Sequence, residues 1–136
     1  MYTVTTEQSF DSAHFLAGYK GKCKNIHGHR WRVLIKVGSE QLEDDGMVVD
    51  FKKLKKDLKE MAEYFDHCFI IEKDSLKPGT QQALLEEGFR IVEVPFRPTA
   101  EHFSKYFYDK MSEKGYAVQE AIVYETPNNC ASYYVR

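Results

Sequence analysis

The chain has 136 residues, and its 19 lysines and arginines nearly balance 21 aspartates and glutamates, for a formal net charge of −2. This balance argues against binding that depends on bulk positive charge, as in nonspecific nucleic-acid binding. Hydrophobic residues make up 43% of the chain, with nine Phe and nine Tyr, which excludes an intrinsically disordered protein. We expect a single domain over residues 1–136.

The chain shows no signal for export or membrane insertion. Its first residues lack a basic segment followed by an apolar one, and no run approaches the ~18 apolar residues of a membrane span. Three cysteines are an odd count and too few for a disulfide scaffold. We therefore expect a cytoplasmic protein with neither a membrane nor a nucleic acid as partner.

Hydrophobic periodicity predicts two strands at the start of the chain. Over residues 2–10, β-forming side chains occupy alternate positions, and this strand is expected to end near His14. A loop punctuated by Gly18 and Gly21 follows. Residues 30–37 alternate more strictly between apolar and charged side chains, a pattern typical of a half-buried strand.

Two long amphipathic helices are predicted further along. Apolar residues recur at helical spacing over residues 50–64. They recur again after Thr99, a suitable N-cap, until Gly115 ends the second helix. A short helix over residues 80–87 and a short strand over residues 90–94 lie between the two.

Two final strands, residues 117–125 and 131–135, are separated by a turn at Pro127-Asn128-Asn129.

The lysines of the first long helix are expected to form a solvated face, because no aromatic side chain is interleaved for base stacking. The order of elements predicts an α+β fold with helices on one face of an antiparallel sheet.

The densest chemical signal is a group of histidines at the start of the second strand. His27 and His29 project to the same face of an extended segment, and His14 ends the preceding strand. Three neutral imidazoles suit a tetrahedral Zn²⁺ with one open position, as in catalytic zinc sites. A His-x-His pair alone is common in proteins without metal, but the third histidine and the nearby Cys23 favour a metal site, with Zn²⁺ as its ion.

Cys23 has two functional interpretations. As a fourth ligand it would complete a closed, structural Cys-His₃ site. As a thiolate beside the metal it would act as a base or nucleophile, favoured by the cation and by Lys22 and Lys24. The alternative without function is a small buried hydrophobe, which the glycine- and lysine-rich surroundings disfavour.

Three further residues carry candidate chemistry. Asp66 and His67 are adjacent at the end of the first long helix, so a carboxylate-oriented proton relay requires a turn of the chain there. A histidine stabilised by the helix C-terminus is the simpler interpretation. Glu125 lies on an otherwise apolar strand face and suits a ligand with paired N–H donors, although a solvent-rim glutamate is the simpler interpretation.

These features together resemble the 6-pyruvoyltetrahydropterin synthase family, which includes the 6-carboxytetrahydropterin synthases of queuosine and deazapurine biosynthesis. The resemblance covers essentially the whole chain, and the order and combination of its motifs are specific. The motifs are Phe10-Asp11-Ser12-Ala13-His14, Cys23-x₃-His27-Gly28-His29, Gly46-Met47-Val48-Val49-Asp50-Phe51, Asp66-His67, Pro98-Thr99-Ala100-Glu101 and Glu125-Thr126.

The resemblance implies a set of site residues and an assembly. The set comprises zinc ligands (His14, His27, His29), a catalytic thiol with two relay partners (Cys23, Asp66, His67) and an anchor for the pterin ring (Glu125). The implied fold is the tunnelling fold, a four-stranded antiparallel sheet with two long helices on one face. Trimers close their sheets into a barrel and stack as a homohexamer, with active sites between subunits, where Cys23 would meet the relay pair of a neighbour.

The implied activity is that of a zinc-dependent lyase acting on 7,8-dihydroneopterin triphosphate, with release of acetaldehyde and triphosphate. The three residues between Cys23 and His27 are similar to the carboxytetrahydropterin branch. Formation of 6-pyruvoyltetrahydropterin is the alternative within the family, and a non-catalytic structural zinc module is the alternative outside it. The chain departs from the family pattern at Ile70-Ile71, where Leu-Asn is usual, and in a longer segment over residues 72–94.

Overall fold

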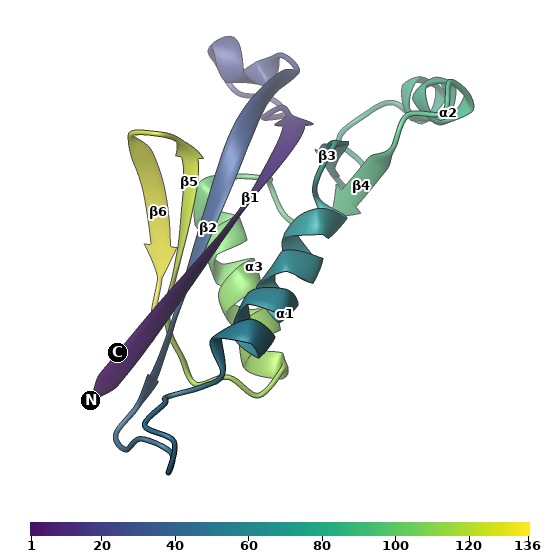
Figure 1. Ribbon diagram of the computed structural model, residues 1–136. Helices are drawn as coiled ribbons and strands as arrows, with labels where there is room; N and C mark the ends of the chain where they lie inside the picture. The colour runs from purple at the N-terminus through teal and green to yellow at the C-terminus, as the bar shows by residue number, and fades with distance from the viewer.

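The computed structural model describes all 136 residues and shows a curved six-stranded sheet with two long helices across one face (Figure 1). The strands are β1 (Tyr2–His14), β2 (His27–Ser39), β3 (Cys68–Glu72), β4 (Ile91–Val94), β5 (Val118–Thr126) and β6 (Asn129–Tyr133). The helices are α1 (Phe51–Tyr64), α2 (Pro78–Glu86) and α3 (Ala100–Glu113), with a short 3-10 helix, η1, at Lys22–Lys24. None of these helices combines the length and apolar character needed to cross a membrane.

Four antiparallel strands form the greater part of the sheet, as predicted. β1 pairs with β2 over its full length, from Tyr2 opposite Ser39 to His14 opposite His27, and β5 joins β2 to β6. Strands β1 and β2 are longer than the periodic segments from which they were predicted. Their register brings His14 and His27 together at one end of the strand pair.

Two short strands extend the sheet beyond the four antiparallel strands that the family resemblance implies. β3 pairs parallel with β1, and β4 pairs parallel with β3, which gives the order β4-β3-β1-β2-β5-β6. The strand over residues 90–94 is expected from the sequence, whereas β3 is not. Its five residues form an apolar run too short to distinguish a strand from the end of a helix.

Helices α1 and α3 cover one face of the sheet and bury the core against it. Asp50 caps α1 by accepting from the Lys52 N–H, and Thr99 caps α3 as predicted by accepting from the His102 N–H. The large buried core side chains are Phe10, Trp31, Ile35, Leu54, Leu58, Phe65, Phe103, Phe107 and Met111. Helix α2 buries no residue and lies away from this two-helix layer (Figure 1).

Candidate metal centre and active site

Three histidines converge at the end of the β1–β2 strand pair. The ring centroids of His14 and His27 lie 4.5 Å apart, and those of His27 and His29 lie 4.8 Å apart. All three Nε2 atoms are buried, and none has a hydrogen-bond partner. Because a buried polar atom without a partner is costly, these three nitrogens are candidate metal ligands.

The hydrogen bonds of two of these rings select the tautomer that binds metal. The Nδ1–H of His14 donates to the Pro98 carbonyl, and the Nδ1–H of His27 donates to the Asn25 carbonyl, both at 2.7 Å. A carbonyl oxygen only accepts, so the proton lies on Nδ1 and the Nε2 lone pair is free. Burial lowers the pKa of His29, which favours its neutral form as well.

A rigid base supports the histidines. The Trp31 ring centroid lies 4.9 Å from that of His14 and 5.6 Å from that of His29, and Trp31 is fully buried. His14 itself is 1% exposed. Trp31 therefore gives His14 and His29 a packed aromatic neighbour at this end of the strand pair.

The structure adds Glu125 to this group. Its Oε1 lies 3.2 Å from the Nε2 of His14 and 3.0 Å from the Nε2 of His29. Glu125 is thus a half-buried carboxylate beside the histidines rather than an ordinary solvent-rim glutamate.

This donor set fits a divalent metal ion. The ligand atoms of His14, His27, His29 and Glu125 all lie within 4.8 Å of one another. In its Nδ1–H tautomer, a neutral His14 presents a lone pair to a carboxylate oxygen, an arrangement that a shared cation stabilises. The residues present could therefore hold a metal ion, and imidazole nitrogen is a preferred donor for zinc and for several other transition metals.

The chain turns sharply after α1 and brings Asp66 and His67 into contact. His67 has a φ of 54°, in the left-handed region that few residues other than glycine adopt. This turn places the His67 Nδ1 at 2.9 Å from the Asp66 Oδ2. The turn of the chain that the sequence analysis requires for this contact is therefore present.

A network around Asp11 holds the Asp66–His67 pair. The Asp66 Oδ1 accepts from the Asp11 N–H at 2.8 Å, and the His67 N–H donates to the Asp11 carbonyl at 2.7 Å. The Asp11 N–H is the main cause that lowers the pKa of Asp66. Arg30 binds the Asp11 carboxylate through two hydrogen bonds of 3.1 Å. The Asp66 carboxylate is therefore ionised at neutral pH and fixed in orientation.

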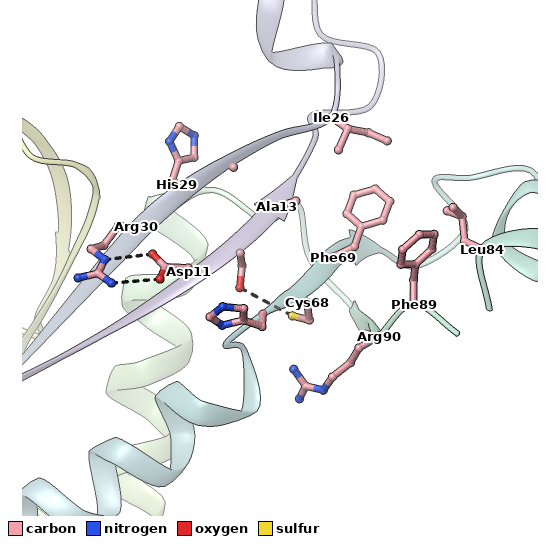
Figure 2. A pocket seen from close by; sticks show the side chains of 13 residues that line it. Asp11, Ala13, Ile26, His29, Arg30, Cys68, Phe69, Leu84, Phe89 and Arg90 are labelled. Atoms are coloured by element: carbon pink, nitrogen blue, oxygen red, sulfur yellow. Dashed lines mark hydrogen bonds and ion pairs between the residues drawn. The ribbon is translucent and has the colours of Figure 1, made fainter. Parts of the chain in front are cut away.

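His67 and Cys68 line a cavity of about 750 Å³ beside β3 (Figure 2). Its apolar wall includes Phe69 from β3, and Leu84 and Phe89 from the segment over residues 72–94. That longer segment, in which the chain departs from the family pattern, therefore contributes directly to the cavity. Apolar walls with a few polar groups are typical of small-molecule sites.

A second cavity, of about 560 Å³, is lined by Glu125 and Tyr124. Residues 28–30 of β2 line both this cavity and the first. The start of β2 thus separates a cavity next to the metal-ligand group from a cavity next to the Asp66–His67 pair. Both cavities include His29.

Cys23 lies apart from both groups of residues. It occupies η1 in the loop between β1 and β2, as a half-buried free thiol. Its sulfur does not belong to the group of ligand atoms around the histidines, and it lines neither cavity. Within one chain, the structure brings the histidines to Glu125 and brings Asp66 to His67, but it brings Cys23 to neither.

The sequence model of one protein family, described as 6-pyruvoyl tetrahydropterin synthase, matches residues 3–136. The chain belongs to this family. Among curated proteins, it is 32% identical to the 6-carboxy-5,6,7,8-tetrahydropterin synthase of Rickettsia felis, with 94% of this chain and 96% of the relative aligned. The proteins of the same name from two other bacteria are also similar. That of Haemophilus influenzae is 29% identical, with 98% of this chain and 99% of the relative aligned. That of Aquifex aeolicus is 36% identical, with 82% of this chain and 75% of the relative aligned. The family is thus one of tetrahydropterin synthases.

Solved structures confirm the α+β tunnelling fold. An uncharacterized protein of Wolinella succinogenes superposes with a TM-score of 0.83 at 22% identity, over 99% of this chain and 98% of the other. The 6-pyruvoyltetrahydropterin synthase of Plasmodium vivax superposes with a TM-score of 0.72 at 22% identity and the same coverage. That of Caenorhabditis elegans, at 25% identity, gives 0.68 over 100% and 98% of the two chains.

Proposed function

We propose that the protein is a 6-carboxy-5,6,7,8-tetrahydropterin synthase that acts in queuosine biosynthesis. The observation that carries this proposal is the convergence of three unpaired histidine Nε2 atoms beside Glu125. Relatives named for this activity align with almost the full length of the chain, which supports the same conclusion. The reaction class is that of a carbon–carbon lyase.

The proposed reaction balances without an external oxidant or reductant. 7,8-Dihydroneopterin triphosphate and water yield 6-carboxy-5,6,7,8-tetrahydropterin, acetaldehyde and triphosphate. The pterin ring gains two electrons, and the three-carbon side chain, which ends as the carboxylate carbon and acetaldehyde, supplies them. No nicotinamide is required, and the sequence contains no G-x-G-x-x-G fingerprint for one.

The histidines and Glu125 take the binding roles. His14, His27 and His29 would hold a Zn²⁺ ion, whose Lewis acidity would make the hydroxyl groups of the substrate side chain more acidic. Glu125, ionised and facing the second cavity, would accept paired N–H groups from the edge of the pterin ring.

Proton transfer falls to Cys23 and the Asp66–His67 pair. Asp66 accepts the Nδ1–H of His67, which leaves the His67 Nε2 free to accept a proton and return it. The Cys23 thiolate would remove a proton from the substrate side chain. Because Cys23 contacts neither residue within its own chain, we propose that it meets the pair of a neighbouring subunit in a homohexamer.

Product identification on the purified, zinc-loaded protein tests the proposal. We expect acetaldehyde and triphosphate in equal amounts, together with 6-carboxy-5,6,7,8-tetrahydropterin. The alternative within the family, supported by the names of the solved structures, is 6-pyruvoyltetrahydropterin synthase. A pyruvoyl product without acetaldehyde would establish that alternative and overturn the proposal.

A further inference from the structure

The loop between β1 and β2, residues 15–26, concentrates positive charge next to the metal-ligand group. It contains three lysines, Lys20, Lys22 and Lys24, and it contains no aspartate or glutamate. The loop starts directly after His14 and ends directly before His27, so both of its ends are joined to candidate metal ligands. The three lysine side chains are exposed and form no ion pair with a carboxylate of the chain.

Arg97 adds a fourth cation to this loop from the other side. It lies in the connection between β4 and α3, one residue before Pro98, whose carbonyl holds the His14 ring. Its Nη2 donates to the Ala17 carbonyl at 3.2 Å, and its guanidinium carbon lies 5.9 Å from the centre of the Tyr19 ring. Arg97 thereby holds the loop next to the segment that precedes the N-terminus of α3.

The hydrogen bonding of Arg97 is incomplete. Its Nε is buried and has no hydrogen-bond partner, and no carboxylate of the chain pairs with its guanidinium. Two other arginines differ in this respect, since Arg30 pairs with Asp11 and Arg32 pairs with Glu7. The positive charge of the Arg97 guanidinium is therefore not compensated by a carboxylate of the chain, which leaves it available to an anionic ligand.

The proposed substrate carries a polyphosphate that could pair with these cations. In a dihydroneopterin triphosphate, the triphosphate is attached to the same three-carbon side chain whose hydroxyl groups must reach the metal-ligand group. The phosphates must therefore lie within a few bonds of the histidines. Both ends of the cationic loop, and the residue next to Arg97, belong to that same neighbourhood.

We propose that Arg97 and the loop lysines bind the triphosphate group of the substrate. The identity of this polyphosphate rests on the proposed function, whereas the uncompensated cations are a property of the fold. The planar guanidinium suits two-point binding of a phosphate, and the lysines act as mobile point charges. The same cations stabilise the negative charge that develops when triphosphate leaves.

Binding of inorganic triphosphate to the zinc-loaded protein tests this assignment directly. Isothermal titration calorimetry compares the wild type with Arg97→Gln and with the triple variant Lys20→Gln/Lys22→Gln/Lys24→Gln. We expect the Kd for triphosphate to rise about tenfold or more in Arg97→Gln, because a charge-assisted hydrogen bond is lost. The triple variant should also bind more weakly and depend less on salt.

Matched controls separate a specific site from general charge. Lys52→Gln/Lys55→Gln/Lys56→Gln removes the same charge from the exposed face of α1, and we expect it to leave the Kd unchanged. Arg97→Lys keeps the positive charge but loses the planar guanidinium that binds a phosphate at two points, and it should bind triphosphate with intermediate affinity. If Arg97→Gln loses zinc or unfolds, the triple variant decides, because its side chains make no packed contact in the core.

The outcomes also separate this inference from the proposed function. If the wild type does not bind triphosphate, or if Arg97→Gln and the triple lysine variant both bind it as the wild type does, the triphosphate site is wrong even when turnover is normal. If triphosphate binding depends on these residues but dihydroneopterin triphosphate is not converted, the anion site holds and the proposed function fails. Binding of unphosphorylated 7,8-dihydroneopterin should be the same in the wild type and Arg97→Gln.

Discussion

A neutral histidine offers a lone pair to a partner only when its other nitrogen keeps the proton. His14 and His27 meet this condition by donating Nδ1–H to backbone carbonyls, and His67 meets it by donating to Asp66. These histidines differ in solvent exposure, because the His14 side chain is 1% exposed and that of His67 is 79% exposed. The same hydrogen-bond pattern therefore suits a fixed metal ligand at His14 and a proton carrier at His67, the roles we propose for them.

The role of Cys23 can be tested by Cys23→Ala. The thiol lies outside the group of ligand atoms, so we expect the variant to retain its metal and its stability. Turnover should fall by about 100-fold or more, as expected for loss of a general base. Zinc content is measured by mass spectrometry on dialysed protein, beside activity. Loss of metal together with a lower melting temperature would instead identify Cys23 as a structural ligand.

Glu125→Gln distinguishes two roles for a carboxylate that lies beside the histidines. An amide cannot accept two N–H groups as a carboxylate does, so a ring anchor predicts a KM raised by about tenfold or more with zinc retained. Steady-state kinetics and metal analysis on the same preparation give both quantities. A variant that loses zinc would show that Glu125 is a fourth ligand, and an unchanged KM would exclude the anchor role.

At the level of elements, the segment over residues 72–94 contacts the turn that carries Asp66 and His67. Arg90 donates through Nη1 to the Asp66 carbonyl at 2.9 Å and through Nη2 to the Tyr64 carbonyl. These are carbonyls at the end of α1, which have no partner within the helix. The guanidinium therefore fastens the turn in which His67 adopts its left-handed conformation.

Arg90→Gln tests this positioning role. We expect kcat to fall about tenfold, since a misplaced relay loses geometric precision, while KM and zinc content stay the same. Arg90→Lys should recover part of kcat, because an ammonium can still reach one carbonyl. The measurement is steady-state kinetics with circular dichroism as a check on the fold. An unchanged kcat in Arg90→Gln would contradict the role.

A second contact between elements ties α1 to the start of β5. The Tyr116 hydroxyl donates to the Asp57 Oδ2 at 2.6 Å and is the main cause that lowers the pKa of Asp57. A depressed carboxyl pKa stabilises the fold above the unfolded pKa and loses this effect as pH falls through the folded pKa. We expect Tyr116→Phe to lower the free energy of unfolding by about 1–2 kcal/mol at pH 7.

The pH dependence of that loss is the decisive part. In urea unfolding followed by fluorescence, the difference between wild type and Tyr116→Phe should shrink as pH falls below the usual carboxyl range. An equal difference at neutral and acidic pH would mean that packing of the ring, rather than the ionised Asp57, accounts for the effect.

Local patterns predict some of these features and not others. Strand periodicity was sufficient to predict the histidine group, because positions two apart share a face and β1 and β2 are consecutive. The Asp66–His67 contact depends on the backbone angle of one residue, which no periodicity reveals. The approach of Glu125 to His29 depends on pairing between β2 and β5, whose partners are about 90 positions apart. Such pairings are decided by the whole sheet.

At the level of the whole molecule, the separation of Cys23 from the Asp66–His67 pair predicts complementation between subunits. Cys23→Ala and His67→Ala should each be inactive alone. If subunits are mixed by unfolding and refolding together, about a quarter of interface sites combine an intact thiol with an intact relay, so activity should return to that level. Mixing without refolding is the control. An activity that stays at zero in assembled mixtures would place each site within one chain.

The register of the first strand pair has a consequence for how the chain tolerates changes in length. His14 stands opposite His27 at the end of a 13-residue strand whose other end, Tyr2, is paired with Ser39. Deleting or inserting one residue within β1 would turn His14 to the opposite side of the sheet, with every side chain between the change and the strand end. The proposed metal centre therefore depends on the number of residues in β1 as well as on the histidines themselves.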